Sequence, residues 1–348
     1  MGIRATIADV ARTAGVSAST ASVVFSGKTA VTDATRRRVL EAAASLGYSG
    51  PDPRAASLRT GRSGIVGVVF EEHLRTAFLD PVKTALMDGL TDAVAPLGAG
   101  LLLLRDSDAG AQGGTSLGTA PLDAVVLVGC SGRIRESLEI VHSRGIPVVV
   151  VEGDAGEGVP QIRLDNRDAQ RHAAHHLRAL GHERVGIAAL PLDAERARGP
   201  IDDERLAAAT VAVTIDRLAG ARDVYPDAPA VAASSSSIDE GLEAGRTLLA
   251  AQPRPTAIIA QSDLLAAGVI RAAEGAGLRV PEDLSVTGFD GITVDGLAPY
   301  ELTTLVQPAV EKGRAAGEAV ARMLAGDTVE TIHFTCVFRE GNTTGAAP

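Results

Sequence analysis

Three histidines stand close enough along the chain to bind a metal ion. His172, His175 and His176 share one helix face at spacings of i, i+3 and i+4, an arrangement that can hold zinc. A zinc site also needs further cysteine, histidine or aspartate ligands nearby, and the surrounding sequence offers none. We therefore predict no metal site and no cofactor.

Signatures of the common enzyme sites are also missing from the sequence. The segment VGCSGR differs from the G-x-S-x-G nucleophile motif, and GAQGG is a turn-rich segment rather than a phosphate-binding loop. The two cysteines, Cys130 and Cys336, are expected to be small buried residues rather than a disulfide. We find no catalytic constellation and predict that the protein is not an enzyme.

Charge is distributed unevenly along the 348 residues. Residues 1–64 carry nine Lys/Arg and four Asp/Glu, whereas the rest of the chain carries 24 and 39, so a head of +5 precedes a body of −15. This asymmetry is typical of a basic nucleic-acid-binding unit joined to an acidic body. The length also favours a small head followed by one or two larger units.

Nothing in the sequence indicates export or insertion into a membrane. No run of about 18 apolar residues is present, and Asp9 stands where the apolar segment of a secretory signal would continue. We predict a cytoplasmic protein without a membrane partner.

The basic head has the pattern of three short helices. Thr6 can cap a helix over residues 7–14, Gly15 supplies the following turn, and Ser17 caps a second helix. Thr32 caps the third helix, whose predicted apolar stripe consists of Val39, Leu40, Ala43 and Leu46. Three helices with a glycine turn between the first two match the helix-turn-helix, whose second helix enters the major groove of DNA. A small helical bundle without a role in DNA binding is the alternative.

After Gly64 the sequence alternates between β-rich runs and helical stretches. The predicted strands are residues 65–70, 101–104, 124–128, 147–151, 185–189, 256–260 and 285–289. The predicted helices include residues 81–97, 133–143, 168–180, 238–251 and 263–275. Most strands are apolar throughout, as in parallel sheets covered on both faces. This alternation predicts a doubly wound α/β fold, with surface loops at residues 108–118 and 228–237.

Two consecutive segments of the head carry a recognisable pattern. They are TIADVARTAGVSASTASVVFSGKTAVTDATRRRVLEAAASLGY, Thr6 to Tyr48, and DPRAASLRTGRSG, Asp52 to Gly64. Together they resemble the lac repressor (LacI/GalR) family of bacterial transcription regulators. The second segment is similar to the family's hinge, which folds into a short helix on the operator and inserts a leucine into the minor groove. The resemblance implies a headpiece at residues 1–49 and a hinge at residues 50–63.

The residues of the predicted hinge support this assignment independently. Asp52 is a suitable N-cap and Pro53 suits the first helical position. A helix over residues 54–59 is too short to be stable in water, so it should form only against a partner. Leu58 is then a candidate wedge between base pairs. Packing of Leu58 on a second copy of the chain without DNA is the alternative.

The resemblance also implies which residues contact DNA. The predicted set is Thr6, Ser17, Ala18, Ser19, Thr20, Ser22, Val23, Thr32, Thr35, Tyr48, Ala55 and Leu58. Ala18, Ser19 and Val23 occupy the positions of the base readers, where the family commonly has longer polar residues. Neither alanine nor valine can make bidentate contacts with a base, so we expect weak base discrimination and a larger share for DNA shape.

Three segments of the body extend the resemblance over most of the chain. They are IRLDNRDAQRHAAHHLRALGHERVGI, AIIAQSDLLAAGVIRAAEGAGLRVPEDLSVTGFD and LTTLVQPAVEKGRAAGEAV. They imply two doubly wound lobes facing a cleft, as in periplasmic sugar-binding proteins. Lobe one is expected at residues 64–164 and 291–326, and lobe two at residues 165–290 and 327–341. The crossovers between lobes then fall near Asp165, Gly291 and Gly326.

Ligands of open α/β sheets bind beyond the carboxyl ends of the strands. Asp290 directly follows one predicted strand, and Ser262 and Asp263 follow another. The resemblance adds Arg205 as the arginine that holds ligand hydroxyls or carboxylates. The predicted effector contacts are Asp80, Arg205, Ser236, Ser262, Asp263 and Asp290. The chain departs from the family at Ser262, where asparagine is common, and at Ser236, where a ring is common. Helix capping by Asp263 and a surface ion pair of Arg205 are the structural alternatives.

These observations predict a homodimeric DNA-binding repressor controlled by a small molecule, a sugar or related metabolite, bound between the lobes. Two headpieces on a symmetric dimer can read a palindromic operator. Ligand binding would change how the lobes next to the hinges pair, and so whether the hinge helices form on DNA. Two other hypotheses are a solute-binding module of a transport system, which predicts an exported chain, and an enzyme acting on sugars or nucleotides.

Overall fold

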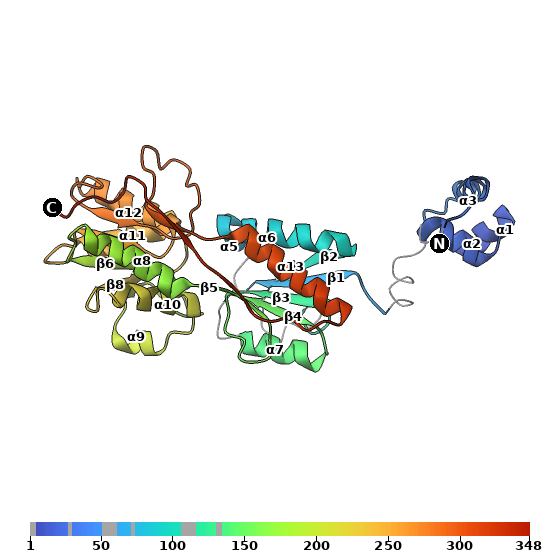
Figure 1. The fold of residues 1–348 in the computed structure, drawn as a ribbon, viewed down its shortest axis with the longest axis horizontal. Helices are drawn as coiled ribbons and strands as arrows, with labels where there is room; N and C mark the ends of the chain where they lie inside the picture. Colours follow the sequence, from blue (N-terminus) through green and yellow to red (C-terminus); the bar gives the residue numbers. More distant parts are fainter. Residues whose placement is uncertain (1–4, 27–29, 51–60, 71–73, 106–115, 130–133) are drawn as a thin grey trace. The chain divides into compact units, whose positions relative to one another are not determined.

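The computed structural model describes residues 5–26, 30–50, 61–70, 74–105, 116–129 and 134–348. The chain separates into two compact units, Met1–Gly64 and Ile65–Pro348 (Figure 1). Each unit has its own hydrophobic core.

The first unit is built from three helices. They are α1 (Ile7–Ala14), α2 (Ala18–Ser26) and α3 (Asp33–Ser45). Thr6 caps α1 in a reciprocal arrangement, because its side chain accepts from the backbone N–H of Asp9 while its own N–H donates to the Asp9 carboxylate. Gly15 has a φ of 66°, which provides the left-handed turn between α1 and α2. The predicted helix-turn-helix arrangement is present.

The core of this unit differs from the predicted one on α3. Val39 and Ala43 are buried as expected, but Leu40 and Leu46 are 47% and 38% exposed. The helix turns Val39, Ala42 and Ala43 inward at spacings of i, i+3 and i+4, and Leu40 falls outside this face. The predicted stripe is therefore wrong at both leucines.

Lobe one of the second unit is a six-stranded parallel sheet in the order β12-β5-β4-β3-β1-β2. Its strands are β1 (Ile65–Phe70), β2 (Gly100–Arg105), β3 (Ala124–Val128), β4 (Val148–Val151), β5 (Gln161–Leu164) and β12 (Ile332–Phe334). The helices of this lobe are α5 (Leu74–Leu79), α6 (Pro81–Val94), which continues as the turn η1 (Ala95–Leu97), α7 (Ile134–Ser143) and α13 (Ala309–Ala325). Helices α6 and α13 cover one face of the sheet and α7 covers the other (Figure 1).

Glycines let α6 and α13 pack with their backbones in contact. A Cβ atom at Gly89 would collide with the carbonyl of Val310, and one at Gly313 would collide with the carbonyl of Leu86. The absence of side chains at these positions fixes α13 firmly on lobe one.

Lobe two is a second, five-stranded sheet in the order β10-β9-β6-β8-β7, parallel except at its edge strand β7. Its strands are β6 (Val185–Ala189), β7 (Gly199–Pro200), β8 (Ala230–Ala232), β9 (Ala257–Ala260) and β10 (Ser285–Thr287). Its helices are α8 (Asn166–Ala179), α9 (Asp203–Ala207), α10 (Ala212–Arg222), α11 (Ile238–Leu249) and α12 (Asp263–Gly275). Helices α11 and α12 cover one face, and α8 and α10 cover the other. Together the lobes confirm the predicted α/β fold.

The structure moves two of the three predicted crossovers. The first lies at Asp165, between β5 and α8. β11 (Thr304–Val306) pairs with β13 (Val337–Arg339) and bridges to Asp290, so the second crossover follows β11, at Gln307 rather than near Gly291. Because β12 belongs to the sheet of lobe one, the third crossover lies between β12 and β13 rather than near Gly326. Residues 291–306 therefore belong with lobe two and residues 327–334 with lobe one.

One predicted surface loop is also wrong. Residues 228–237 contain β8, an inner strand of lobe two whose three residues are all buried. The strand consists of two alanines and one valine, so it lacks the β-branched and aromatic run by which strands are recognised.

Candidate functional site

Small side chains form the outward face of α2. Ala18 and Ser19 are exposed, and Ser22 and Val23 are half-buried. A surface that enters the major groove would therefore present two hydroxyls and two apolar groups to the bases. The positions predicted to read bases are accessible, and their role remains a prediction.

The start of α2 is tied together by hydroxyl groups. The Ser17 hydroxyl accepts from the backbone N–H of Thr20 at 3.1 Å and lies 2.8 Å from the hydroxyls of both Ser19 and Thr20. These groups surround a helix N-terminus, where backbone N–H groups and the helix dipole favour an anion. Phosphate contacts predicted for Ser17 and Thr20 are compatible with this placement.

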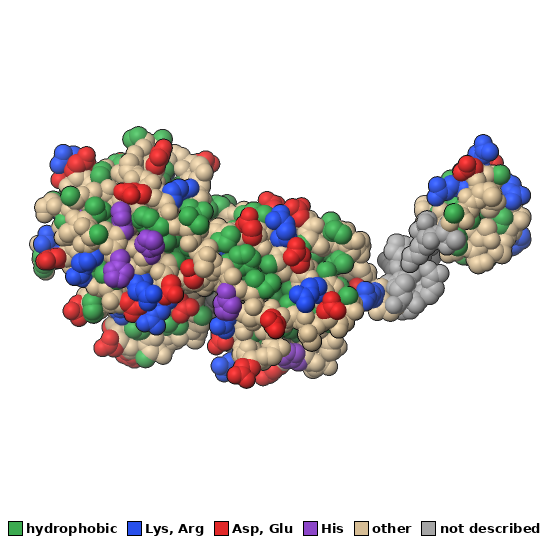
Figure 2. Space-filling view, viewed as in Figure 1, with side chains coloured by type: hydrophobic (Ala, Val, Ile, Leu, Met, Phe, Trp, Pro, Cys, Tyr) green, Lys and Arg blue, Asp and Glu red, His purple; other side chains and the backbone are tan. Residues whose placement is uncertain are grey.

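The remaining described candidates of the head also lie at helix ends. Thr32 caps α3 by accepting from the backbone N–H of Thr35 at 3.3 Å. The Tyr48 ring packs edge-on against Phe25, with centroids 5.4 Å apart. Lys and Arg side chains predominate over Asp and Glu on the visible face of this unit (Figure 2). The predicted contacts Ala55 and Leu58 lie outside the described residues.

In the body, Asp290 lies beyond the end of β10 in the interior. Its Oδ1 accepts a hydrogen bond from Nε2 of Gln307 at 2.6 Å and lies 3.7 Å from an Nη atom of Arg217. Burial raises the pKa of Asp290 well above its ordinary value, against the charge of Arg217, and the nearby carboxylates of Asp263 and Asp80 raise it further. Asp290 therefore lies near one cation, Arg217, and near two other carboxylates, Asp263 and Asp80.

Arg217 is the arginine that lies against Asp290. Its side chain is 3% exposed, and its guanidinium lies 3.5 Å from the ring centroid of Phe289. Its Nε donates to Asn166 Oδ1 at 2.8 Å, and an Nη donates to the carbonyl of Gln261 at 2.6 Å. These contacts come from α8 and from the residues that follow β9 and β10, so they hold the guanidinium in one orientation beside Asp290.

Arg205 has a different position from the one expected. Its guanidinium donates to the carbonyls of Ala197, Gly199 and Pro200, which belong to the segment just before α9. It brings this segment together locally, whereas the arginine that lies beside Asp290 is Arg217. Both arginines precede a Leu-Ala pair in similar helix-forming sequence, so the local pattern alone does not distinguish them.

The two predicted serines of the effector site lie together. Ser262 begins α12, where its hydroxyl accepts from the backbone N–H of Leu265 at 3.2 Å. The Ser236 hydroxyl donates to that of Ser262 at 2.9 Å. The pair joins the ends of β8 and β9, at the edge of the sheet where Asp290 lies.

Asp263 is fully buried and uses both oxygens within the fold. Oδ1 accepts from the Thr304 hydroxyl at 2.5 Å, and Oδ2 accepts from the backbone N–H of Ile292 at 2.8 Å. Burial raises the pKa of Asp263 to about 6 despite these donors. The arrangement fixes the segment after β10 to α12, whereas Ser262 rather than Asp263 caps that helix, so the capping alternative for Asp263 is wrong.

Asp80 belongs to lobe one and caps α6. Its Oδ1 accepts from the backbone N–H of Val82 at 3.0 Å, and Oδ2 lies 3.6 Å from Lys83 Nζ. Its charge acts on Asp290 of lobe two. The structure thus brings Asp80, Asp263 and Asp290 into one electrostatic neighbourhood.

Sequence reasoning missed several charged residues of this neighbourhood. Arg217 and Lys312 are buried, and each is the one charged residue on the buried face of its helix. A cation at such a position is the signal that could have identified both. Glu152 directly follows β4, so the strand-end rule that selected Asp290 applies to it as well.

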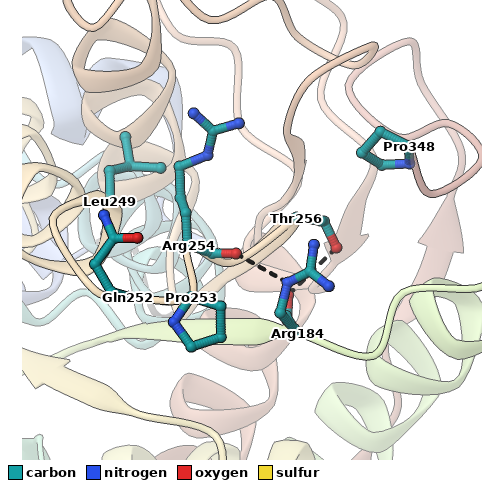
Figure 3. Close-up of a pocket in the computed structure, with 7 residues that line it drawn as sticks. All are labelled: Arg184, Leu249, Gln252, Pro253, Arg254, Thr256 and Pro348. Atoms are coloured by element: carbon teal, nitrogen blue, oxygen red, sulfur yellow. Dashed lines mark hydrogen bonds between the residues drawn. The ribbon is translucent and has the colours of Figure 1, made fainter.

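A separate hollow of about 530 Å³ lies at the other end of lobe two (Figure 3). Its lining consists of Arg184, Leu249, Gln252, Pro253, Arg254, Thr256 and Pro348. Arg184 precedes β6 and Thr256 precedes β9, so the hollow lies at the amino ends of the strands, away from Asp290. Arg184 Nε donates to the carbonyl of Arg254 at 3.1 Å, and both residues line the hollow.

Two of the three closely spaced histidines of α8 pack against an aromatic ring. His172 and His176 both lie with centroids 4.9 Å from that of Phe338. No group of three metal-binding side chains occurs among the described residues.

Burial raises the pKa of Cys336 to about 12, which makes it a poor nucleophile. Within the described ranges, no helix is both long and apolar enough to cross a membrane.

The helix-turn-helix head and the two-lobed body define a DNA-binding regulator. Residues 6–50 match the model for bacterial regulatory proteins of the lacI family, and residues 174–339 match a periplasmic binding protein-like domain. The HTH-type transcriptional regulator Rv3575c of Mycobacterium tuberculosis is 35% identical over 334 residues, covering 92% of this chain and 91% of that protein. The chain therefore belongs to the LacI family of transcriptional regulators.

Solved structures agree with the fold over the whole length of the chain. The transcriptional regulator CelR in complex with cellobiose is 25% identical with a TM-score of 0.66, covering 98% of this chain and 100% of that chain. The lac repressor dimer bound to operator and the anti-inducer ONPF shares the fold, with a TM-score of 0.76, 22% identity and coverage of 99% and 100%. The family and fold expected from the sequence are confirmed.

Proposed function

We propose that this regulator is a repressor that binds a palindromic operator as a homodimer and responds to a small polyhydroxylated metabolite. The observation that carries the proposal is the opposition of Asp290 and Arg217 at the carboxyl end of a parallel sheet, in a chain that also has a helix-turn-helix head. Its parts are a headpiece at residues 1–49, a hinge at residues 50–63 and an effector-binding body from residue 64.

Asp290 and Arg217 suit a ligand rich in hydroxyl groups. A carboxylate accepts hydrogen bonds from hydroxyls and a guanidinium donates to them, and such charge-assisted bonds are stronger than neutral ones. Asp80 and Glu152 add carboxylates from lobe one. A ligand held by residues of both lobes favours one arrangement of the lobes over another and so changes the affinity for operator.

Two solved structures support the partners in this proposal. CelR is bound to the sugar cellobiose, and the lac repressor is bound to its operator as a dimer. Relatives that match the whole chain are named as transcriptional regulators, which favours a non-enzymatic role. A solute-binding module of a transport system would not need the basic head. Because the proposed target is operator DNA, we assign the protein to the cytoplasm.

The proposal can be tested on duplexes selected by the full-length chain from a random pool. The logarithm of the binding constant should fall with the logarithm of the salt concentration, with a slope of about −0.9 for each neutralised phosphate. Ser19→Asp places a negative charge on the exposed face of α2 and is expected to weaken binding about a hundredfold. Cellobiose and a panel of other sugars are then screened for release of the selected duplex.

Two variants separate the head from the effector site. Ser116→Asp adds the same charge to an exposed turn of lobe one and should leave binding to the duplex unchanged. Asp290→Asn should keep binding to the duplex but lose the response to any sugar that releases it from wild type. The absence of a preferred duplex would refute the proposal for the head. A sugar response retained in Asp290→Asn would refute the effector site.

A further inference from the structure

Five polar side chains form a continuous series of contacts that joins the two lobes. In order they are Glu152, Lys312, Gln307, Asp290 and Arg217. Glu152 follows β4 and Lys312 belongs to α13, so both are part of lobe one, whereas Asp290 and Arg217 belong to lobe two. Gln307 lies between β11 and α13, on the second crossover. The series therefore runs along one of the crossovers between the lobes. Any change in the arrangement of the lobes must alter this crossover.

A buried ion pair forms the lobe-one end of the series. Lys312 Nζ donates to Glu152 Oε1 and to Gln307 Oε1. The side chains of Lys312 and Glu152 are only 1% and 15% exposed. Burial acts to raise the pKa of Glu152, but the charges of Lys312 and Arg217 outweigh it and leave that pKa below its ordinary value. A buried ammonium needs such partners, and here it has two.

Two neighbours of Gln307, Lys312 and Asp290, fix the orientation of its amide. The ammonium of Lys312 can only donate, so it requires the amide oxygen. An ionised Asp290 can only accept, so it requires the amide NH2 group, which lies 2.6 Å from its Oδ1. Rotation of the amide by half a turn would place donor against donor and acceptor against acceptor. Lys312 thereby determines which group Gln307 presents to Asp290.

Backbone geometry gives an independent indication that the series is functional. Glu152 has a φ of 55° and Asp290 a φ of 123°, both in the region that favours glycine. Among the described non-glycine residues, only Arg196 shares a positive φ with them. Strained residues of this kind persist where their surroundings hold them, and they cluster at ligand-binding and switching sites. Two of these three positions lie in one series of side chains.

We propose that Lys312 is a positioning residue, which holds the Gln307 amide and through it ties the Asp290 carboxylate to lobe one. The proposal rests on the proposed function only in taking Asp290 as an effector contact. A ligand hydroxyl that donates to Asp290 shares this carboxylate with the Gln307 amide, so ligand binding is transmitted to Lys312. From there it reaches α13, which is packed against α6 through Gly89 and Gly313.

The test compares two charge-neutral variants of the full-length chain. Lys312→Met/Glu152→Gln removes both charges together and removes the donor at position 312 from the Gln307 oxygen. Lys312→Gln/Glu152→Gln removes the same charges but keeps a donor at position 312. The titration of Asp290 is followed by carbon NMR on protein labelled at aspartate Cγ, with the signal assigned from Asp290→Asn. The other groups that face Asp290, which are Arg217, Asp263 and Asp80, are the same in both variants.

The expected result is a rise of about one pH unit in the Asp290 midpoint in the methionine pair, because an ionised carboxylate loses a held donor. The glutamine pair should stay near wild type. Equal midpoints in two folded variants overturn the proposal. Should the methionine pair not fold, Gln307→Leu in the glutamine pair replaces it, and an unmoved midpoint there also overturns the proposal.

This measurement uses neither DNA nor a small molecule. A chain that failed to select any duplex would therefore leave the result on Lys312 standing. Conversely, the wild-type chain could bind its duplex and respond to a sugar while the methionine pair showed no shift in the Asp290 midpoint. That result would support the proposed regulator and overturn the role of Lys312. A purely structural ion pair would give the same titration in both neutral pairs.

Discussion

Two neighbouring helices of lobe two carry an arginine in almost the same sequence, and they use it in opposite ways. Arg205 stands in Asp-Glu-Arg-Leu-Ala on α9, and Arg217 stands in Ile-Asp-Arg-Leu-Ala on α10. Helix α9 has five residues and none is buried, whereas α10 has eleven and a buried inner face. Arg205 bonds to carbonyls five to eight residues before it, while Arg217 bonds to groups more than 40 residues away.

The difference shows that the face of the helix, rather than the local sequence, decides what each arginine does. A side chain on the solvent face can satisfy its donors with water or nearby carbonyls, and its loss costs little. A guanidinium on the inner face must find all its partners within the protein, so it organises groups from several elements. Recognition of the inner arginine therefore requires the register of the helix.

Arg217→Met should produce the largest effect on stability. The substitution leaves Asp290 without its opposing charge, and leaves Asn166 and the Gln261 carbonyl without their donor. Removal of one partner of a buried pair costs about 3–5 kcal/mol. We expect a loss of this size in the free energy of unfolding, measured by urea denaturation at neutral pH.

The double variant Arg217→Met/Asp290→Leu is the control for this prediction. It removes both charges, so a large part of the lost stability should return. A loss below about 1 kcal/mol in Arg217→Met alone would show that the guanidinium is not confined as the contacts indicate. Failure of the double variant to recover would place the effect in packing on Phe289 rather than in the charge pair.

Two carboxylates at helix starts, one buried and one exposed, are expected to differ in how the stability that they contribute depends on pH. Asp263 begins α12 in the buried region, with a pKa raised to about 6 by burial, whereas Asp202 caps the exposed α9. The folded chain therefore keeps the proton of Asp263 between about pH 4 and 6, where the unfolded chain has lost it. Stability from this group is present below that window and is lost as the pH rises through it, by about 3 kcal/mol.

This dependence can be measured by urea denaturation across the window in wild type and in Asp263→Asn. The variant has no proton to release at this position, so its free energy of unfolding should vary less with pH than that of wild type. Asp202→Asn keeps a good capping residue and controls for the loss of a carboxylate at a helix start. Parallel pH profiles for wild type and Asp263→Asn would contradict the assignment.

Much of the architecture could be predicted because it depends on local patterns. A few consecutive residues determine each of these patterns, which are the cap at Thr6, the turn at Gly15 and the apolar runs of β1, β3 and β4. These signals depend on helix capping and burial on both faces of a sheet. They were sufficient for the helix-turn-helix and the α/β body.

Features that depend on distant partners were not predictable in this way. β12 is a short strand, and only its pairing with β5, more than 160 residues earlier, places it in lobe one. β8 is buried but consists of alanine and valine. Asp290 itself could be predicted, because it directly follows a predicted strand. Its partners Arg217 and Gln307 could be identified only from the folded arrangement.

Arg205→Met should produce the smallest effect. The three carbonyls that lose a donor belong to a segment near the surface, where water can replace the guanidinium, so we expect a loss of about 1 kcal/mol or less in urea denaturation. The substitution is chemically the same as Arg217→Met, which makes the two variants a matched pair. Binding to a selected duplex and release by a sugar should both resemble wild type. Loss of the sugar response in Arg205→Met, with the response kept in Arg217→Met, would reverse the assignment of the two arginines and restore the one made from sequence.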